Sequence, residues 1–108
     1  MVTLETFRQL ALSFPGAEER PHFEKISFRV KNKIFATLSA TENRACLKLS
    51  LVNQSVFCAY DKNIIYAVPN KWGQQGWTLF ELQKIKKEML KDALSTAYDE
   101  VLLKNKKI

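Results

Sequence analysis

Apolar residues recur at helical spacing near both ends of the chain. The first stripe lies between Thr3, which can cap a helix, and Pro15-Gly16, which ends it; its members are Leu4, Phe7, Ala11 and Phe14. The second stripe predicts a closing helix from about Lys86; its members are Leu90, Leu94, Ala97 and Val101. This stripe lapses at Lys104, so we expect Lys104–Ile108 to be a frayed tail.

Between these helices the period of the pattern changes from helical to alternating, which predicts strands. The predicted strands are Ile26–Val30, Ile34–Leu38, Arg44–Leu49, Ile64–Val68 and Trp77–Phe80. Ser50 or Asn53 can cap a short helix that runs to Tyr60, and residues 17–25 are a connector or an edge strand. The order predicts a single α+β domain over residues 1–108, with two layers, a five-stranded antiparallel sheet and helices packed on one face.

Alternation also assigns the side chains of the first three strands to two faces. The expected core face consists of Ile26, Phe28, Val30, Ile34, Ala36, Leu38, Ala45, Leu47 and Leu49. The opposite face consists of Ser27, Arg29, Lys31, Lys33, Phe35, Thr37, Arg44, Cys46 and Lys48. Its five basic groups can follow a phosphate backbone, and Phe35 can stack on an unpaired base. The alternative is that these are solvated side chains that keep the sheet from aggregating.

The segment Pro69–Thr78 is the second unusual stretch, because it carries two glycines and two tryptophans. Lys71, Trp72 and Gln74 can contact phosphates, bases or base edges. The alternative is a long loop held in place by burial of one or both indoles. We expect Trp77 to lie in the core, whereas the sequence leaves both possibilities open for Trp72.

The net charge is +6, and the excess lies in the middle of the chain, where residues 25–91 hold twelve basic and four acidic side chains. This distribution suggests an anionic partner. Cys46 and Cys58 have no second cysteine or histidine at metal-ligand spacing, so we expect reduced thiols, no metal and a cytoplasmic protein. The start of the chain does not resemble a signal peptide, and no apolar run approaches the ~20 residues of a membrane span.

Catalytic signals are weak. His22 is the only histidine, and a structural role is the commoner one for such a residue. Arg44 and Lys48 flank Cys46 on its own face and would lower the pKa of an exposed thiol; the alternative is that Cys46 fills space in the core. We expect no enzyme, no catalytic residues and no cofactor, and we keep an enzyme acting on a small anion near His22 and Lys48 as a third hypothesis.

Several segments, taken in order, carry a family resemblance. They are Leu12–Glu19, Pro21-His22-Phe23, Phe28-Arg29-Val30, Lys33–Ala36, Leu47-Lys48-Leu49, Val68-Pro69 and Trp72–Thr78. Together they resemble the MmcQ/YjbR family over nearly the whole chain. The resemblance implies an α-β3-α-β2-α fold of the CyaY-like or secretion-chaperone-like kind. It also implies a double-wing shape like a DNA-binding module of a phage transcription activator, which is an analogy of structure.

The leading expectation is therefore a nucleic-acid (DNA)-binding module that binds weakly and largely independently of sequence. Its expected binding residues are Arg29, Lys31, Lys33, Phe35, Arg44, Lys48, Lys71, Trp72 and Gln74. The alternative is a protein-interaction or self-association domain that covers the same open sheet face with a partner or a second copy. No membrane partner is expected.

Overall fold

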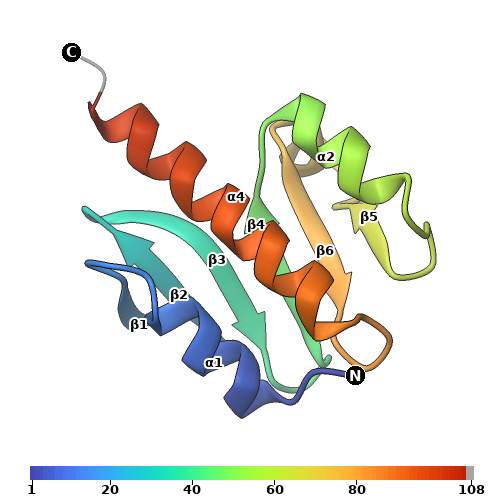
Figure 1. Ribbon diagram of the computed structural model, residues 1–108, viewed down its shortest axis with the longest axis horizontal. Helices are drawn as coiled ribbons and strands as arrows, with labels where there is room; N and C mark the ends of the chain where they lie inside the picture. The colour runs from blue at the N-terminus through green and yellow to red at the C-terminus, as the bar shows by residue number, and fades with distance from the viewer. Residues whose placement is uncertain (107–108) are drawn as a thin grey trace.

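The computed structural model describes residues 1–106 and shows one six-stranded antiparallel sheet with four helices (Figure 1). The helices are α1 (Leu4–Leu12), α2 (Leu51–Cys58), α3 (Lys71–Gln74) and α4 (Lys87–Lys106). The strands are β1 (Glu18–His22), β2 (Lys25–Val30), β3 (Lys33–Ser39), β4 (Arg44–Lys48), β5 (Ile65–Ala67) and β6 (Trp77–Glu81). They lie in the order β1-β2-β3-β4-β6-β5.

The three longer helices cover one face of the sheet. Figure 1 shows α4 running across the middle strands, with α1 beside it over β1 and β2 and α2 over the β5 side. The core forms between these layers, where Phe7 of α1 meets Phe28 of β2 at a ring-centroid distance of 5.6 Å. Leu90 and Leu94 of α4 are fully buried, as the helical stripe predicted. The other face of the sheet carries no helix layer, so the α+β class and the open antiparallel sheet are confirmed.

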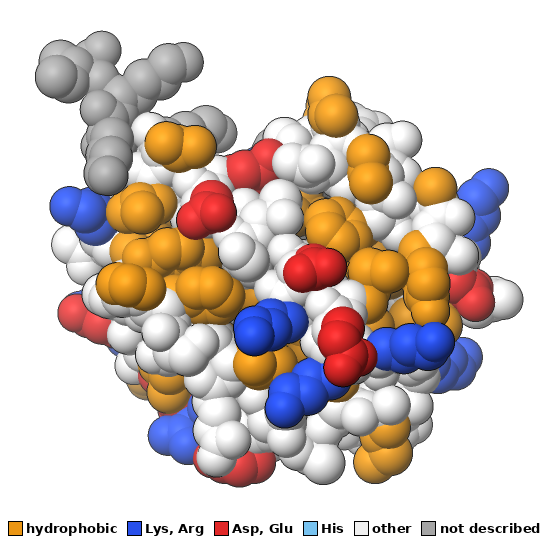
Figure 2. All heavy atoms as spheres, viewed as in Figure 1, with side chains coloured by type: hydrophobic (Ala, Val, Ile, Leu, Met, Phe, Trp, Pro, Cys, Tyr) orange, Lys and Arg blue, Asp and Glu red, His pale blue; other side chains and the backbone are white. Residues whose placement is uncertain are grey.

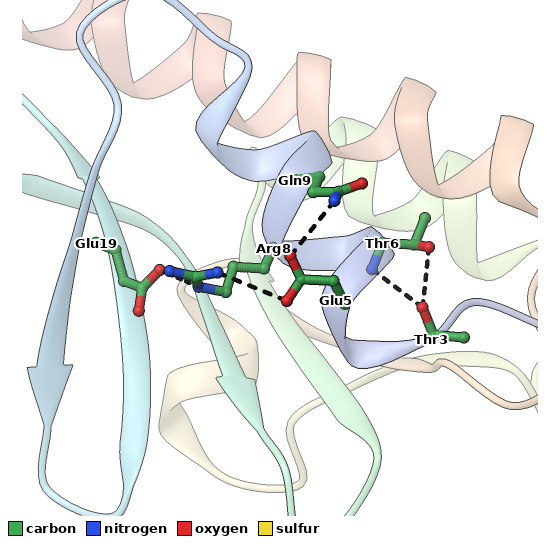
Figure 3. A network of polar contacts seen from close by, with 6 residues as sticks. All are labelled: Thr3, Glu5, Thr6, Arg8, Gln9 and Glu19. Atoms are coloured by element: carbon green, nitrogen blue, oxygen red, sulfur yellow. Dashed lines mark hydrogen bonds and ion pairs between the residues drawn. The ribbon is translucent and has the colours of Figure 1, made fainter.

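The first helix begins where the sequence predicted and is tied to the edge of the sheet. The Thr3 side chain accepts a hydrogen bond from Thr6 N at 3.0 Å, which satisfies one of the amide groups left unpaired at a helix start. Arg8 forms ion pairs with Glu5 one turn earlier and with Glu19 of β1 (Figure 3). The hydrogen bond and the charge of Glu19 raise the pKa of Arg8, so the guanidinium stays charged and links α1 to β1.

The sheet has six strands rather than the predicted five, and a short fourth helix is added. The extra strand β1 carries the polar sequence Glu-Glu-Arg-Pro-His and pairs only with β2, as an edge strand can, since backbone pairing needs no apolar side chains. The extra helix α3 spans four residues, too few for a hydrophobic period. The backbone of α4 stays helical to Lys106, so the prediction of a frayed tail is wrong for residues 104–106. Residues 107–108 lie outside the described part of the chain.

The predicted position of Phe35 on the open face is wrong, because the pairing of β2 and β3 is irregular. Phe28 lies opposite Ala36 and Arg29 lies opposite Ile34, so Phe35 has no partner across the ladder. One extra residue in a strand reverses the faces of the residues beyond it. Phe35 therefore turns to the helix side, is 0% exposed, and packs against the rings of Phe14 and Tyr98 at centroid distances of 6.3 and 5.6 Å. Ile34 takes the open-face position instead.

The outer surface of the helix layer carries charges of both signs. Figure 2 shows acidic and basic side chains interspersed along α4, with apolar side chains gathered beside its C-terminal half. Within residues 1–106, none of the helices combines the length and the apolar character that crossing a membrane requires.

Candidate nucleic-acid interface

The open face of the sheet is a closely packed surface in which polar and apolar side chains alternate. Its central row runs across the strands as Ser27, Thr37, Cys46 and Leu79, which the register places side by side. Ser27 is fully buried on this face, and its hydroxyl is satisfied there, since it donates to Arg20 O at 2.9 Å and accepts from Arg29 Nε at 3.1 Å. The middle of the face is therefore held by its own side chains, and the charged groups lie toward its two ends.

One end of the face is a closed polar network around Tyr66. Arg44 donates to the Tyr66 hydroxyl at 3.0 Å and pairs with Glu42 at 2.9 Å, and the Tyr66 hydroxyl donates to Glu81. Burial and the bond to Glu81 raise the pKa of Tyr66, while the bond to Tyr66 raises the pKa of Arg44. Two acidic side chains and a phenol already surround Arg44. The environment of this predicted binding residue is therefore that of a structural residue, held in the polar network at this end of the face.

The other end of the face opens into a groove, because β3 and β4 diverge there. The two strands pair from Ala36↔Leu47 to Ser39↔Arg44, whereas Ile34 pairs only with β2 and Lys48 only with β6. The resulting space has a volume of about 1050 Å³. We call it the β3–β4 groove; it is lined by Arg29, Asn32, Lys33, Ile34, Lys48, Leu49, Ser50, Trp77, Glu100, Val101 and Leu103.

The groove has basic groups at its rim and apolar groups inside. Arg29 and Lys48 lie on β2 and β4, and Lys33 begins β3 after the tight turn. Leu49 and Val101 are almost fully buried and form the floor. Glu100 is the acidic residue of the lining, and both of its carboxylate oxygens already accept hydrogen bonds from the start of α2, one from Ser50 N at 2.8 Å and one from Asn53 Nδ2 at 2.6 Å.

The predicted Trp72 segment lies at the same end of the sheet as the groove. Lys48 Nζ donates to Gln75 O, and Leu49 N donates to Gly76 O at 3.0 Å. Gln54 of α2 donates to Gly73 O at 3.0 Å and to Trp77 O at 3.2 Å. The α3 turn is therefore anchored both to β4 and to α2. Trp72 is 51% exposed on this turn, with Lys71 and Gln74 also exposed.

The structure therefore brings together most, but not all, of the predicted binding residues. Arg29, Lys33 and Lys48 line the groove, and Lys31 lies in the turn that leads to Lys33. The predicted open-face position of Lys33 is wrong, because beyond the unpaired Phe35 it lies opposite the core residue Val30 and so reaches the groove from the helix side. Lys71, Trp72 and Gln74 stand on the adjoining α3 turn. Arg44 lies at the far end of β4 in its own network, and Phe35 is in the core.

Sequence reasoning placed Trp77 in the core, which is wrong. Trp77 pairs with Lys48, shares the open face with it, and is partly buried as a wall of the groove. The apolar lining residues Ile34, Leu49, Val101 and Leu103 were missed as site residues. Among them only Leu103 has an unusual feature, an exposed fraction of 65% for a leucine, and this is visible only in the structure. No sequence pattern reveals that β3 and β4 diverge.

Neither Cys46 nor His22 has an environment that favours chemistry. Burial raises the pKa of Cys46 to about 11, although the charge of Lys25 and a backbone hydrogen bond to Thr78 act against it. The lowering of this pKa by Arg44 and Lys48 was expected only for an exposed thiol; the thiol is largely buried, as the alternative of a space-filling residue predicted, and those cations are directed to Tyr66, Glu42 and Gln75. His22 pairs with Lys25 at the hairpin end of the sheet, away from Lys48. No three His, Cys, Asp or Glu side chains of the described part are grouped to hold a metal ion.

The fold and this face define a small α+β domain whose antiparallel sheet is covered on one side and open on the other. A model of the YjbR family matches residues 12–100, and the chain belongs to that family. Among solved structures it is similar to the Deinococcus radiodurans protein DR2400, a DUF419 domain, with a TM-score of 0.84 and 22% sequence identity. The match covers 99% of this chain and 83% of that chain, and it shows the fold. No curated protein matches the chain.

Proposed function

We propose that this domain binds nucleic acid, weakly and largely independently of sequence, through the end of the open face that contains the β3–β4 groove. The observation that carries the proposal is the convergence of Arg29, Lys33 and Lys48, from three different strands, on the rim of one groove. Lys31 and Lys71 extend this positive surface on the two sides. Such an arrangement can contact consecutive phosphates and gain affinity from the release of their counterions.

The expected weakness follows from the small number of these cations. Four or five phosphate contacts supply the affinity of non-specific binding rather than of sequence-specific recognition. Base-edge reading needs side chains with paired donors and acceptors, and only a few amides lie at this end of the sheet, among them Asn32, Gln74 and Gln75. We therefore expect binding that depends on charge and on strand form more than on base identity.

The test compares two triple variants of equal net charge. The rim variant removes the charges at the rim and keeps polar side chains of similar length; it combines Arg29→Gln, Lys33→Gln and Lys48→Gln. The control variant removes three exposed charges before and within the first turns of α4; it combines Lys84→Gln, Lys87→Gln and Lys91→Gln. At 20 mM salt, with labelled 20-nucleotide and 20-base-pair probes, the rim variant should bind the duplex at least roughly 500-fold more weakly than wild type, because three lost contacts at ~0.9 each change the affinity by about 2.7 orders of magnitude per decade of salt. The control variant should bind nearly as wild type.

Three results would contradict the proposal. Wild-type protein that binds neither probe at concentrations on the order of 100 μM would end it. Equal losses in the two triple variants would show that only net charge attracts the probe. If the rim variant instead changes the sedimentation mass and leaves probe binding unaltered, the face serves a protein partner or a second copy.

A further inference from the structure

The interior of the β3–β4 groove differs from what phosphate binding alone requires. Phosphate contacts need exposed cations, and the rim supplies them. Inside the rim, however, the lining is the ring of Trp77 and the aliphatic groups of Ile34, Leu49 and Val101, with Leu103 at one side. The sheet diverges at this point, so the groove reaches down to α4 and is deeper than an ordinary sheet surface. Its volume of about 1050 Å³ is at the upper end of the range for small-ligand sites.

We propose that this groove takes an unpaired base, with the base against Trp77 and its flanking phosphates at Arg29, Lys33 and Lys48. The inference rests on the proposed function and specifies its ligand as a single strand. In a duplex the bases are stacked and paired, so a duplex offers the rim its phosphates and leaves the apolar interior unfilled. A single strand can satisfy both parts of the groove at once, since every base presents an aromatic face.

The charge around the groove fits this occupant better than an apolar segment of protein. Three cations stand at the rim, and the carboxylate of Glu100 is already bonded to the start of α2. An uncharged apolar segment would withdraw these cations from water and bring no counter-charge, which is costly. A strand brings one phosphate per nucleotide and so neutralises them. Stacking of one base corresponds to roughly 5- to 100-fold in affinity, and the partly open groove favours the lower part of this range.

The first experiment uses Trp77 as its own reporter. Trp72→Phe leaves Trp77 as the sole tryptophan, and Trp72 is 51% exposed, so the fold should tolerate the change. Titration with a 20-nucleotide thymidine strand should quench the Trp77 fluorescence and give at least fivefold tighter binding than a 20-base-pair duplex at equal salt. Thymidine monophosphate should bind much more weakly than the strand, because it supplies a single phosphate; equal affinity would assign the groove to free nucleotides and overturn the strand proposal.

The second experiment places a carboxylate at the groove without disturbing the core. Leu103→Glu changes an exposed wall residue, and Val56→Glu makes the same change on α2, outside the lining, at a similar exposure of 61% against 65%. We expect Leu103→Glu to weaken single-strand binding at least fivefold and duplex binding less, whereas Val56→Glu alters neither by more than about twofold.

The outcomes separate this inference from the proposed function. Binding of strand and duplex with equal affinity, with unchanged Trp77 fluorescence, overturns the base site and leaves the phosphate-binding face intact. Equal effects of Leu103→Glu and Val56→Glu on strand binding also overturn it. Failure of the wild type to bind either probe removes the proposed function itself, and this inference falls with it.

Discussion

At the scale of single residues, Cys46 shows how neighbours decide the chemistry of a side chain. It lies in the central row of the open face, between Thr37 of β3 and Leu79 of β6. This packing withdraws the thiol from water and so disfavours the thiolate, which raises its pKa to about 11. The charge of Lys25 lowers the pKa, but by less than burial raises it. The thiol therefore behaves as a small packing group.

We predict that Cys46 is poorly reactive in the folded protein. With a pKa of about 11 instead of 9.0, its thiolate fraction at pH 8 is about a hundredth of that of an ordinary thiol. Alkylation by iodoacetamide, followed by mass spectrometry of the peptides, should label Cys46 about 100-fold more slowly in native than in unfolded protein. The native rate should keep rising with pH up to about 11. Native labelling at the unfolded rate would contradict the prediction, because it would show a thiol with an ordinary pKa.

The residue scale is also where sequence reasoning was least accurate about the site. Alternation placed Arg29, Arg44 and Lys48 on the open face, and the register confirms that placement. It misplaced Phe35, because one unpaired residue in β3 cannot be seen in a hydrophobic pattern that contains Ile-Phe-Ala in succession. It also misjudged Trp77, since a large aromatic residue in a strand is assigned to the core by default although it can form the wall of a groove.

At the scale of elements, the α3 turn is a rigid support whose shape depends on two glycines. A Cβ on Gly73 would stand 1.9 Å from Val68 O, and a Cβ on Gly76 would stand 1.7 Å from Leu49 O. The backbones therefore approach more closely than any side chain allows. This contact places Gln75 O next to Lys48 and sets the start of β6, so the turn shapes one side of the groove.

We predict that Gly76→Ala lowers the free energy of unfolding by about 3 kcal/mol or more, because it combines a backbone clash with φ of +105°. Gly16→Ala is the matched control. Gly16 also has positive φ, +78°, but the nearest atom to its added Cβ would be Val30 Cγ2 at 3.9 Å. Strain alone should cost about 1 kcal/mol there. Urea denaturation followed by circular dichroism measures both; equal losses would show that the contact between the turn and β4 is not tight.

Elements were predictable wherever a period lasted several residues. The cap at Thr3, the stripe of α4 and the strands from Lys25 to Lys48 follow from such periods and agree with the structure within a residue or two. β1 escaped prediction as a definite strand because its residues are charged and one is Pro21. The divergence of β3 from β4, which creates the groove, begins next to the unpaired Phe35, where the pairing with β4 stops at Ala36, and no local hydrophobic pattern marks this position.

At the scale of the whole molecule, the charges are distributed unequally between the layers. The helix side carries acidic and basic groups in mixture (Figure 2), while the groove end of the sheet gathers Arg29, Lys31, Lys33, Lys48 and Lys71. The molecule measures 37 × 28 × 26 Å, so it covers at most roughly eleven base pairs of duplex at ~3.4 Å each. A 20-base-pair probe is thus long enough for end effects to be small.

This asymmetry predicts a salt dependence that net charge alone cannot reproduce. If four to five phosphates are engaged, the logarithm of the binding constant should fall with the logarithm of salt concentration with a slope of about −3.5 to −4.5 on duplex, and about −3 on a single strand. Replacing Arg29, Lys33 and Lys48 by Gln should flatten the duplex slope by about 2.7, because three contacts are lost at ~0.9 each.

The control variant with Lys84, Lys87 and Lys91 replaced by Gln has the same net charge but keeps the rim, so its slope should stay within about half a unit of wild type. Fluorescence anisotropy between 20 and 200 mM salt measures all three slopes on one probe. The three control lysines and Lys33 are exposed, whereas Arg29 and Lys48 also donate to Ser27 Oγ and Gln75 O. The control variant should therefore unfold at the wild-type temperature, and the rim variant should stay folded but lose about 1 kcal/mol of stability for each of these two bonds, which thermal unfolding measures separately from probe binding. Parallel flattening in the two variants would mean that the probe senses the charge of the whole domain and that the groove has no special part in binding.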